Sequence, residues 1–258
     1  MKAVRKRFGQ HFLHDPAVLQ RIVQAVDPRP GEHIVEIGPG PGALTALLLE
    51  RAGRIDAVEI DRDLAGELRT RWPDALMLHV GDALKFDFAA LARERGGPLR
   101  IVGNLPYNIS TPLLFHLLDA VDDVQDLHVM LQKEVIDRMA AAPGSDDYGR
   151  LTVMLAPRLE VQWLFDVGPG AFQPPPRVWS AVARLRVRPQ PLFPVGEAYG
   201  RVVAAAFSQR RKTLRNSLRG LVPPEAWAAT GIDPGARPEV LAPAQFAALA
   251  ALAPHHAL

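Results

Sequence analysis

The segment that most constrains the fold is a short apolar stretch followed by a run of glycines and prolines. Residues 33–37 predict a buried strand, and residues 43–51 have the pattern of a helix. Between them, residues 38–42 alternate glycine with proline. Strand, glycine-rich turn and helix in this order are typical of an open α/β sheet, where the turn comes close to a nucleotide-like ligand. The two prolines have no N–H to hold a phosphate, so the turn suits a ligand without pyrophosphate.

The alternation of strand and helix continues through the first two thirds of the chain. Further strands are predicted at residues 55–60, 76–80, 99–102, 126–131, 160–167 and 178–187. The last two are expected to be antiparallel to each other, because their connection is short. Helices are predicted to begin near residues 16, 62, 111, 133 and 151. A proline-rich stretch then precedes helical segments at residues 197–207, 210–221, 224–230 and 243–252. We predict an α/β domain over residues 1–188 and an all-helical domain over residues 189–258.

Composition excludes several classes of protein. The chain of 258 residues has no cysteine, which excludes disulfides and thiolate metal sites and fits the cytoplasm. Residues 1–13 are basic and lack the apolar core of a secretory signal. No apolar run approaches the ~20 residues of a membrane span. We therefore expect a cytoplasmic protein without a membrane segment and without a metal.

A polar tetrad, Asn104-Leu105-Pro106-Tyr107, follows the strand at residues 99–102. In an open α/β sheet, ligands bind at this edge. The Asn104 side-chain oxygen and the Leu105 carbonyl can each accept a hydrogen bond from one exocyclic amino group, and Tyr107 offers a face on which a base can stack. An ordinary strand-to-helix turn also often contains Asn and Pro, so the tetrad alone leaves both interpretations open.

Two carboxylates follow neighbouring strands. Glu59 lies about twenty residues after the first glycine of the turn, where an acid reaches ribose hydroxyls. Asp82 follows the next strand and can accept a hydrogen bond from an adenine amino group. A solvent-facing Glu and a turn Asp are the alternatives, but the corresponding positions at two strand ends favour a shared site.

The predicted helix at residues 210–221 carries five cations and no acid: Arg210, Arg211, Lys212, Arg215 and Arg219. Helical spacing places Arg211, Arg215 and Arg219 on one face. Such a run is often a solvated face, but cations without counter-charges also suit a nucleic-acid phosphate backbone.

The motifs together resemble the bacterial small-subunit rRNA adenine N6,N6-dimethyltransferase family over nearly the whole chain. The resemblance rests on the order and spacing of residues 9–13, 35–40, 59–62, 81–83, 104–110, 131–134, 148–151, 172–176 and 209–213. It implies a Rossmann-like class I methyltransferase sheet of seven strands with the last antiparallel, followed by a small helical domain. It also implies S-adenosylmethionine as methyl donor, a monomer, and the small ribosomal subunit as partner, with two adjacent adenosines near the 3′ end of its rRNA as substrate.

The resemblance further implies site residues by position. The cofactor site would be lined by His11, Leu13, Gly38, Gly40, Glu59, Asp82 and Asn104. The target adenine would be held by Asn104, Leu105 and Tyr107, with Phe172 on the other face of the base. The chain departs from the family at His11, where Asn is common, and at Trp179, where Asp is common.

Three other functions remain open at this point. A nicotinamide oxidoreductase fits the glycine-rich turn but leaves the tetrad and the basic segment unexplained. A large-subunit rRNA adenine methyltransferase would share the tetrad. An rRNA-binding assembly factor acting without catalysis would share the basic segment.

Overall fold

The computed structural model describes residues 11–209 and 211–254, and these form two compact units. The first unit comprises the chain up to Ile136 together with Val161–Val187; the second comprises Asp137–Glu160 and the chain from Arg188 onward. The predicted division at residues 188 and 189 therefore misses the segment at residues 137–160. Its Tyr148 and Val153 belong to the apolar core of the second unit, which explains the difference.

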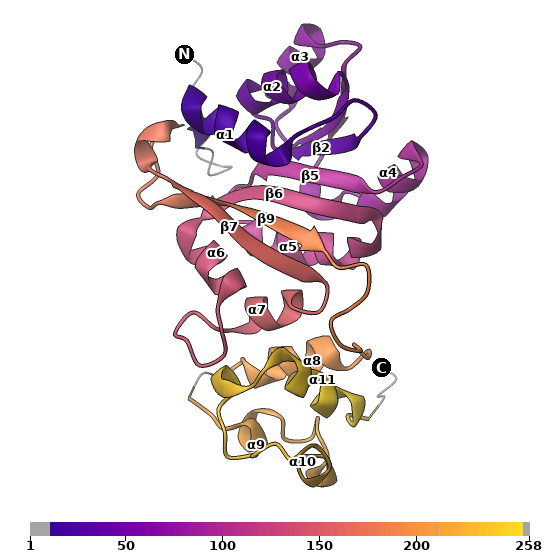
Figure 1. The fold of residues 1–258 in the computed structure, drawn as a ribbon, viewed down its shortest axis with the longest axis vertical. Helices are drawn as coiled ribbons and strands as arrows, with labels where there is room; N and C mark the ends of the chain where they lie inside the picture. The colour runs from indigo at the N-terminus through magenta and orange to yellow at the C-terminus, as the bar shows by residue number, and fades with distance from the viewer. Residues whose placement is uncertain (1–10, 210, 255–258) are drawn as a thin grey trace. The chain divides into compact units, whose positions relative to one another are not determined.

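The centre of the first unit is a seven-stranded sheet, which confirms the predicted fold class (Figure 1). The strand order is β4-β3-β2-β5-β6-β9-β7, with bounds β2 His33–Ile37, β3 Ile55–Glu59, β4 Leu76–Val80, β5 Leu99–Asn104, β6 Val124–Gln132, β7 Leu159–Val167 and β9 Ser180–Val187. The ladders from β4 to β6 are parallel, and β9 is antiparallel to β6. The carboxyl ends of the parallel strands therefore meet at one edge of the sheet.

Helices accompany these strands in the predicted alternation. They are α1 Pro16–Val26, α2 Ala43–Ala52, α3 Arg62–Arg71, α4 Phe88–Arg95, α5 Ser110–Asp119, α6 Lys133–Ala140 and α7 Arg150–Leu155, of which α4 was not predicted. Asp15 caps α1 by accepting from the amides of Ala17 and Val18 at 2.8 and 3.1 Å. The sequence predicts Pro112 as the first residue of α5, with Thr111 as its N-cap. The helix begins two residues earlier, at Ser110, whose hydroxyl donates to the Tyr107 carbonyl at 2.9 Å.

A second, two-stranded sheet joins the chain's beginning to a distant loop. β1 (Phe12–Leu13) pairs antiparallel with β8 (Phe172–Gln173). Two-residue strands carry no periodic pattern, so the sequence did not predict this pairing. It places the N-terminal segment beside the proline-rich loop.

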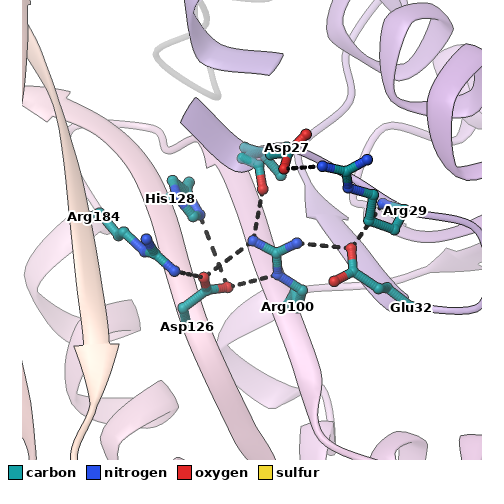
Figure 2. A network of polar contacts seen from close by, with 8 residues as sticks. Asp27, Arg29, Glu32, Arg100, Asp126, His128 and Arg184 are labelled. Carbon is teal, nitrogen blue, oxygen red and sulfur yellow. Dashed lines mark hydrogen bonds and ion pairs between the residues drawn. The ribbon is translucent and has the colours of Figure 1, made fainter. Parts of the chain in front are cut away.

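A buried ionic network lies toward the amino end of β5, as Figure 2 shows. Arg100 donates to Asp126 at 2.9 Å and to Glu32 at 2.7 Å, and Arg184 donates to the same Asp126 at 2.9 Å. Burial opposes charge on Asp126, but the two guanidinium groups and His128 lower its pKa overall. The network joins β5, β6 and β9 at the end opposite Asn104, and so fixes the three strands relative to one another.

The second unit contains α8 Tyr199–Ala206, α9 Leu214–Ser217, α10 Pro224–Thr230 and α11 Pro243–Ala251. The predicted continuous helix at residues 210–221 is wrong, because α9 is only four residues long. The backbone amides of Leu214 and Arg215 donate to the carbonyls of Ala236 and Pro234, and Gly220 has a φ of +78°. The basic residues therefore do not share one long helical face. Arg210 lies outside the described residues, and Arg211, Lys212, Arg215 and Arg219 are exposed.

Candidate functional site

A cavity opens at the carboxyl ends of β2, β3 and β5, within the first unit. It brings together most of the residues predicted for the cofactor and the base: His11, Gly38, Gly40, Glu59, Asp82, Asn104, Leu105 and Tyr107. Phe12, Ile60 and Pro106 also line it, without having been predicted. Parallel strands alone explain most of this convergence, because they end at the same edge.

The backbone amides of the glycine-rich turn are already used within the protein. Gly38 donates to Val58 at 2.9 Å, Gly42 to Pro39 at 2.9 Å, and Gly40 to the Glu59 carboxylate at 3.1 Å. The two remaining positions of the turn are prolines without an N–H. The turn therefore offers no amide to a phosphate, which argues against a dinucleotide and fits a nucleoside cofactor.

Glu59 ends β3 with its carboxylate held in place. One oxygen accepts from the Gly40 amide, and the other accepts from the Asp61 amide at 2.8 Å. Only 3% of the residue is exposed, and this burial raises its pKa although the backbone donors act in the opposite direction. A fixed carboxylate at this place suits the paired hydroxyls of a ribose.

A second carboxylate lies close to the site in the core. Glu36 accepts a hydrogen bond from the Thr45 hydroxyl at 2.6 Å. Complete burial raises its pKa to about 7, and the nearby charge of Glu59 contributes in the same direction.

Phe12 approaches the turn so closely that Gly40 must be a glycine. A Cβ at Gly40 would lie 2.9 Å from the Phe12 ring, and the φ of +56° is one that other residues rarely adopt. β1 thus packs directly on the turn and forms one wall of the cavity.

The amide of Asn104 is oriented by the backbone of β1. Its Nδ2 donates to the His11 carbonyl at 2.9 Å. Because a carbonyl can only accept, the NH2 group must face His11, and the amide oxygen is left for another donor. The Leu105 amide donates to Met130 at 3.1 Å, so the backbone stays in register with β6 up to this point.

Tyr107 is held from two sides. Its phenol shares a 2.6 Å hydrogen bond with the hydroxyl of Ser180, which is fully buried at the start of β9. The His11 ring stacks on it with centroids 5.6 Å apart and 28° between planes. His11 Nδ1 lies 2.8 Å from the Pro174 carbonyl, so this nitrogen carries the proton. Sequence reasoning missed Ser180, which only the sheet topology brings to Tyr107.

Two predicted site residues do not line the cavity. Phe172 is 1% exposed and Leu13 is 8% exposed, and both belong to the apolar core. They face each other in the β1–β8 pairing. The Phe172 side chain packs in the core here, and its stacking on the target base stays a prediction.

The described part of the chain shows neither a grouping of three or more His, Asp or Glu residues suited to a metal nor a helix long and apolar enough for a bilayer.

The family model described as Ribosomal RNA adenine dimethylase matches residues 1–253. The Ribosomal RNA small subunit methyltransferase A of Thiobacillus denitrificans is 57% identical over 254 residues, covering 97% of this chain and 98% of that protein. The protein of the same name from Pseudomonas aeruginosa is 52% identical, covering 95% and 93%.

Two solved structures superpose on this chain over most of its length. A dimethyladenosine transferase from Plasmodium falciparum superposes with a TM-score of 0.79 at 26% identity, covering 93% of this chain and 96% of that one. The 23S rRNA methyltransferase ErmE superposes with a TM-score of 0.69 at 29% identity, covering 94% and 99%. The chain therefore belongs to the ribosomal RNA adenine dimethylase family and is a methyltransferase that uses S-adenosylmethionine.

Proposed function

We propose that this enzyme dimethylates N6 of two adjacent adenosines near the 3′ end of small-subunit rRNA, late in subunit assembly, as a monomer in the cytoplasm. The observation that carries the proposal is the fixed amide of Asn104 beside Tyr107, with its oxygen free to accept from an adenine amino group. Relatives named for the small subunit are more than 50% identical, whereas the 23S enzyme is 29% identical. This difference favours the small-subunit substrate.

The cavity suits the cofactor at several points. We assign Glu59 to the ribose and Asp82 to the adenine amino group, with His11, Gly38 and Gly40 forming the walls. When bound, S-adenosylmethionine supplies an electrophilic methyl group on its sulfonium sulfur. The amides of the glycine-rich turn already donate hydrogen bonds within the protein, so the site favours a cofactor without a phosphate group.

The residues of the tetrad would prepare the adenine for attack. The N6 lone pair is delocalised into the ring, so the amine is a weak nucleophile. The Asn104 oxygen and the Leu105 carbonyl can hold its two hydrogens and favour a pyramidal nitrogen aimed at the methyl group, which is catalysis by positioning. The base must leave its stack, at a cost of a few kcal/mol. Stacking on Tyr107 offsets this by ~1–3 kcal/mol.

The test separates chemistry from binding. Asn104→Ala removes the acceptor, and single-turnover methylation of unmodified small subunits should fall by orders of magnitude while subunit binding persists. Tyr107→Ala should lower occupancy of the pocket as well as rate. Asn108→Ala is the matched control, because Asn108 is exposed and does not line the cavity. Near-normal transfer by Asn104→Ala would remove the catalytic assignment and favour an assembly factor without catalysis.

The second unit supplies the other part of the proposal. We assign rRNA phosphate contacts to Arg210, Arg211, Lys212, Arg215 and Arg219, of which the last four are exposed. Replacing Arg211, Arg215 and Arg219 by Ala should flatten the salt dependence of subunit binding by roughly 0.7–0.9 log units per lost contact. Cofactor affinity should not change. An unaltered salt slope would mean that these cations are only solvated.

A further inference from the structure

Trp179 is an exposed aromatic residue at the edge of the sheet where β5 and β6 end. It directly precedes β9, and 56% of its surface is exposed. We propose that its indole is the stacking surface for the rRNA nucleotide next to the adenosine being methylated. This inference rests on the proposed function and adds a second contact with the substrate.

The sheet places the backbone of Trp179 at the same edge as the target-base site. Its chain neighbour Ser180 hydrogen-bonds the Tyr107 phenol at 2.6 Å. β5, β6 and β9 are successive strands, with Asn104 opposite Met130 and Ser180 opposite Gln132. Two strand spacings separate β5 from β9, roughly 10 Å. An indole and one nucleotide can bridge this distance together.

The indole has a fixed base beneath it. The Trp179 carbonyl accepts from the Lys133 amide at 3.0 Å, which holds the backbone to the end of β6. Three ring carbons would lie 3.6–3.9 Å from a Cβ at Gly168, so the ring packs closely over that glycine. The large exposed fraction shows that much of the rest of the ring is open to solvent. Such a ring can stack with little loss of side-chain freedom.

The reaction itself creates the need for this surface. Drawing one adenosine out of its stack removes a stacking partner from its neighbour, and an aromatic side chain can replace that partner. With two adjacent targets, each adenosine becomes the neighbour when the other occupies the pocket. We favour an RNA base over a protein chain because the reaction removes a stacking partner that the flat indole can replace, although the preceding residue Val178 is also exposed, at 44%.

Steady-state methylation of unmodified small subunits tests the inference with three variants. Trp179→Leu keeps an apolar side chain without an aromatic plane, and it should raise KM about tenfold, or ~1.4 kcal/mol, with little change in kcat. Trp179→Phe should restore most of the loss. Trp163→Leu is the matched control, because Trp163 is 49% exposed on β7 and its indole N–H donates to Asp166. Calorimetric affinity for S-adenosylmethionine should be unchanged in all three.

Several results would overturn the inference. These are an unchanged KM in Trp179→Leu, no recovery in Trp179→Phe, or an equal effect of Trp163→Leu. A loss seen with subunits but absent with a protein-free rRNA fragment would mean that Trp179 contacts a ribosomal protein instead. If the unaltered enzyme transfers methyl groups and the variants match it, this inference alone fails. If the unaltered enzyme transfers none, the proposed function fails.

Discussion

Gly103, the residue before Asn104 in β5, allows a quantitative test of how tightly the sheet holds the site. A Cβ at Gly103 would lie 2.6 Å from the Ile37 carbonyl oxygen and 3.2 Å from a Leu105 methyl. Ordinary contact begins at 3.4 Å, so Gly103→Ala requires β2 and β5 to separate by 3.4 − 2.6 = 0.8 Å. The obstacle is backbone, which cannot rotate away as a side chain could.

The separation acts in two ways. Overpacking of this kind costs about 1–3 kcal/mol of the free energy of unfolding. The displaced strand also carries the Asn104 amide, and a misplacement of about 1 Å can slow a reaction roughly a hundredfold. We therefore expect Gly103→Ala to fold, to lose this much stability, and to transfer methyl groups about a hundred times more slowly.

Urea denaturation and single-turnover methylation measure the two effects. Gly66→Ala in α3 is the control, since nothing lies within 4 Å of its added Cβ. It should leave the rate unchanged and raise stability by up to ~1 kcal/mol. A Gly103→Ala enzyme with a normal rate would refute the argument, even if its stability fell, because it would show that the position of β5 does not determine transfer.

Three further predictions follow from single contacts. Asp126→Ala leaves the Arg100 side chain, which is 6% exposed, without its main partner. The free energy of unfolding, measured by urea denaturation, should fall by ~3–5 kcal/mol, and a fall of less than about 1 kcal/mol would contradict this. Burial lowers the pKa of His128 from its usual 6.5 to about 4, so between these values the unfolded chain binds more protons and stability rises with pH. Glu36, whose pKa is raised to about 7, acts in the opposite direction over the same pH range, so the comparison is with His128→Leu. From about pH 7.5 to about pH 5, the free energy of unfolding of the unaltered chain should fall by about 2 kcal/mol relative to that of His128→Leu. Ser180→Ala removes the hydrogen bond to Tyr107, and transfer should slow roughly fivefold, for ~1 kcal/mol of lost positioning, with cofactor affinity unchanged in calorimetry.

The sequence predicted the parts of the fold that depend on local pattern. The apolar runs of β2 to β6 and the cap at Asp15 are local signals, and the structure confirms them. Most of the cavity followed as well, because Glu59, Asp82 and Asn104 occupy strand ends that a parallel sheet brings to one edge. Recognising the family added His11, which has no local signal.

The remaining features depend on contacts between distant segments. Ser180 reaches Tyr107 only because β9 inserts beside β6, and no local spacing encodes that insertion. Phe172 was predicted to stack on the target base. In the structure its residue pairs with Leu13, and its side chain is buried in the core. The amides of Leu214 and Arg215 donate to carbonyls about twenty residues later in the chain. These bonds replace those of the continuous helix that local propensity favoured.

The pairing of β1 with β8 has a consequence for the order of events during synthesis. Phe12 is made 161 residues before its partner Gln173 (173 − 12), a delay of roughly 8–30 s at ~5–20 residues per second. Until then β1 lacks the strand that holds it, and the His11 carbonyl lacks a fixed place from which to orient Asn104. A nascent chain that ends before β8 therefore has every residue of the tetrad but not its assembled geometry. The enzyme becomes competent only after about two thirds of it has left the ribosome.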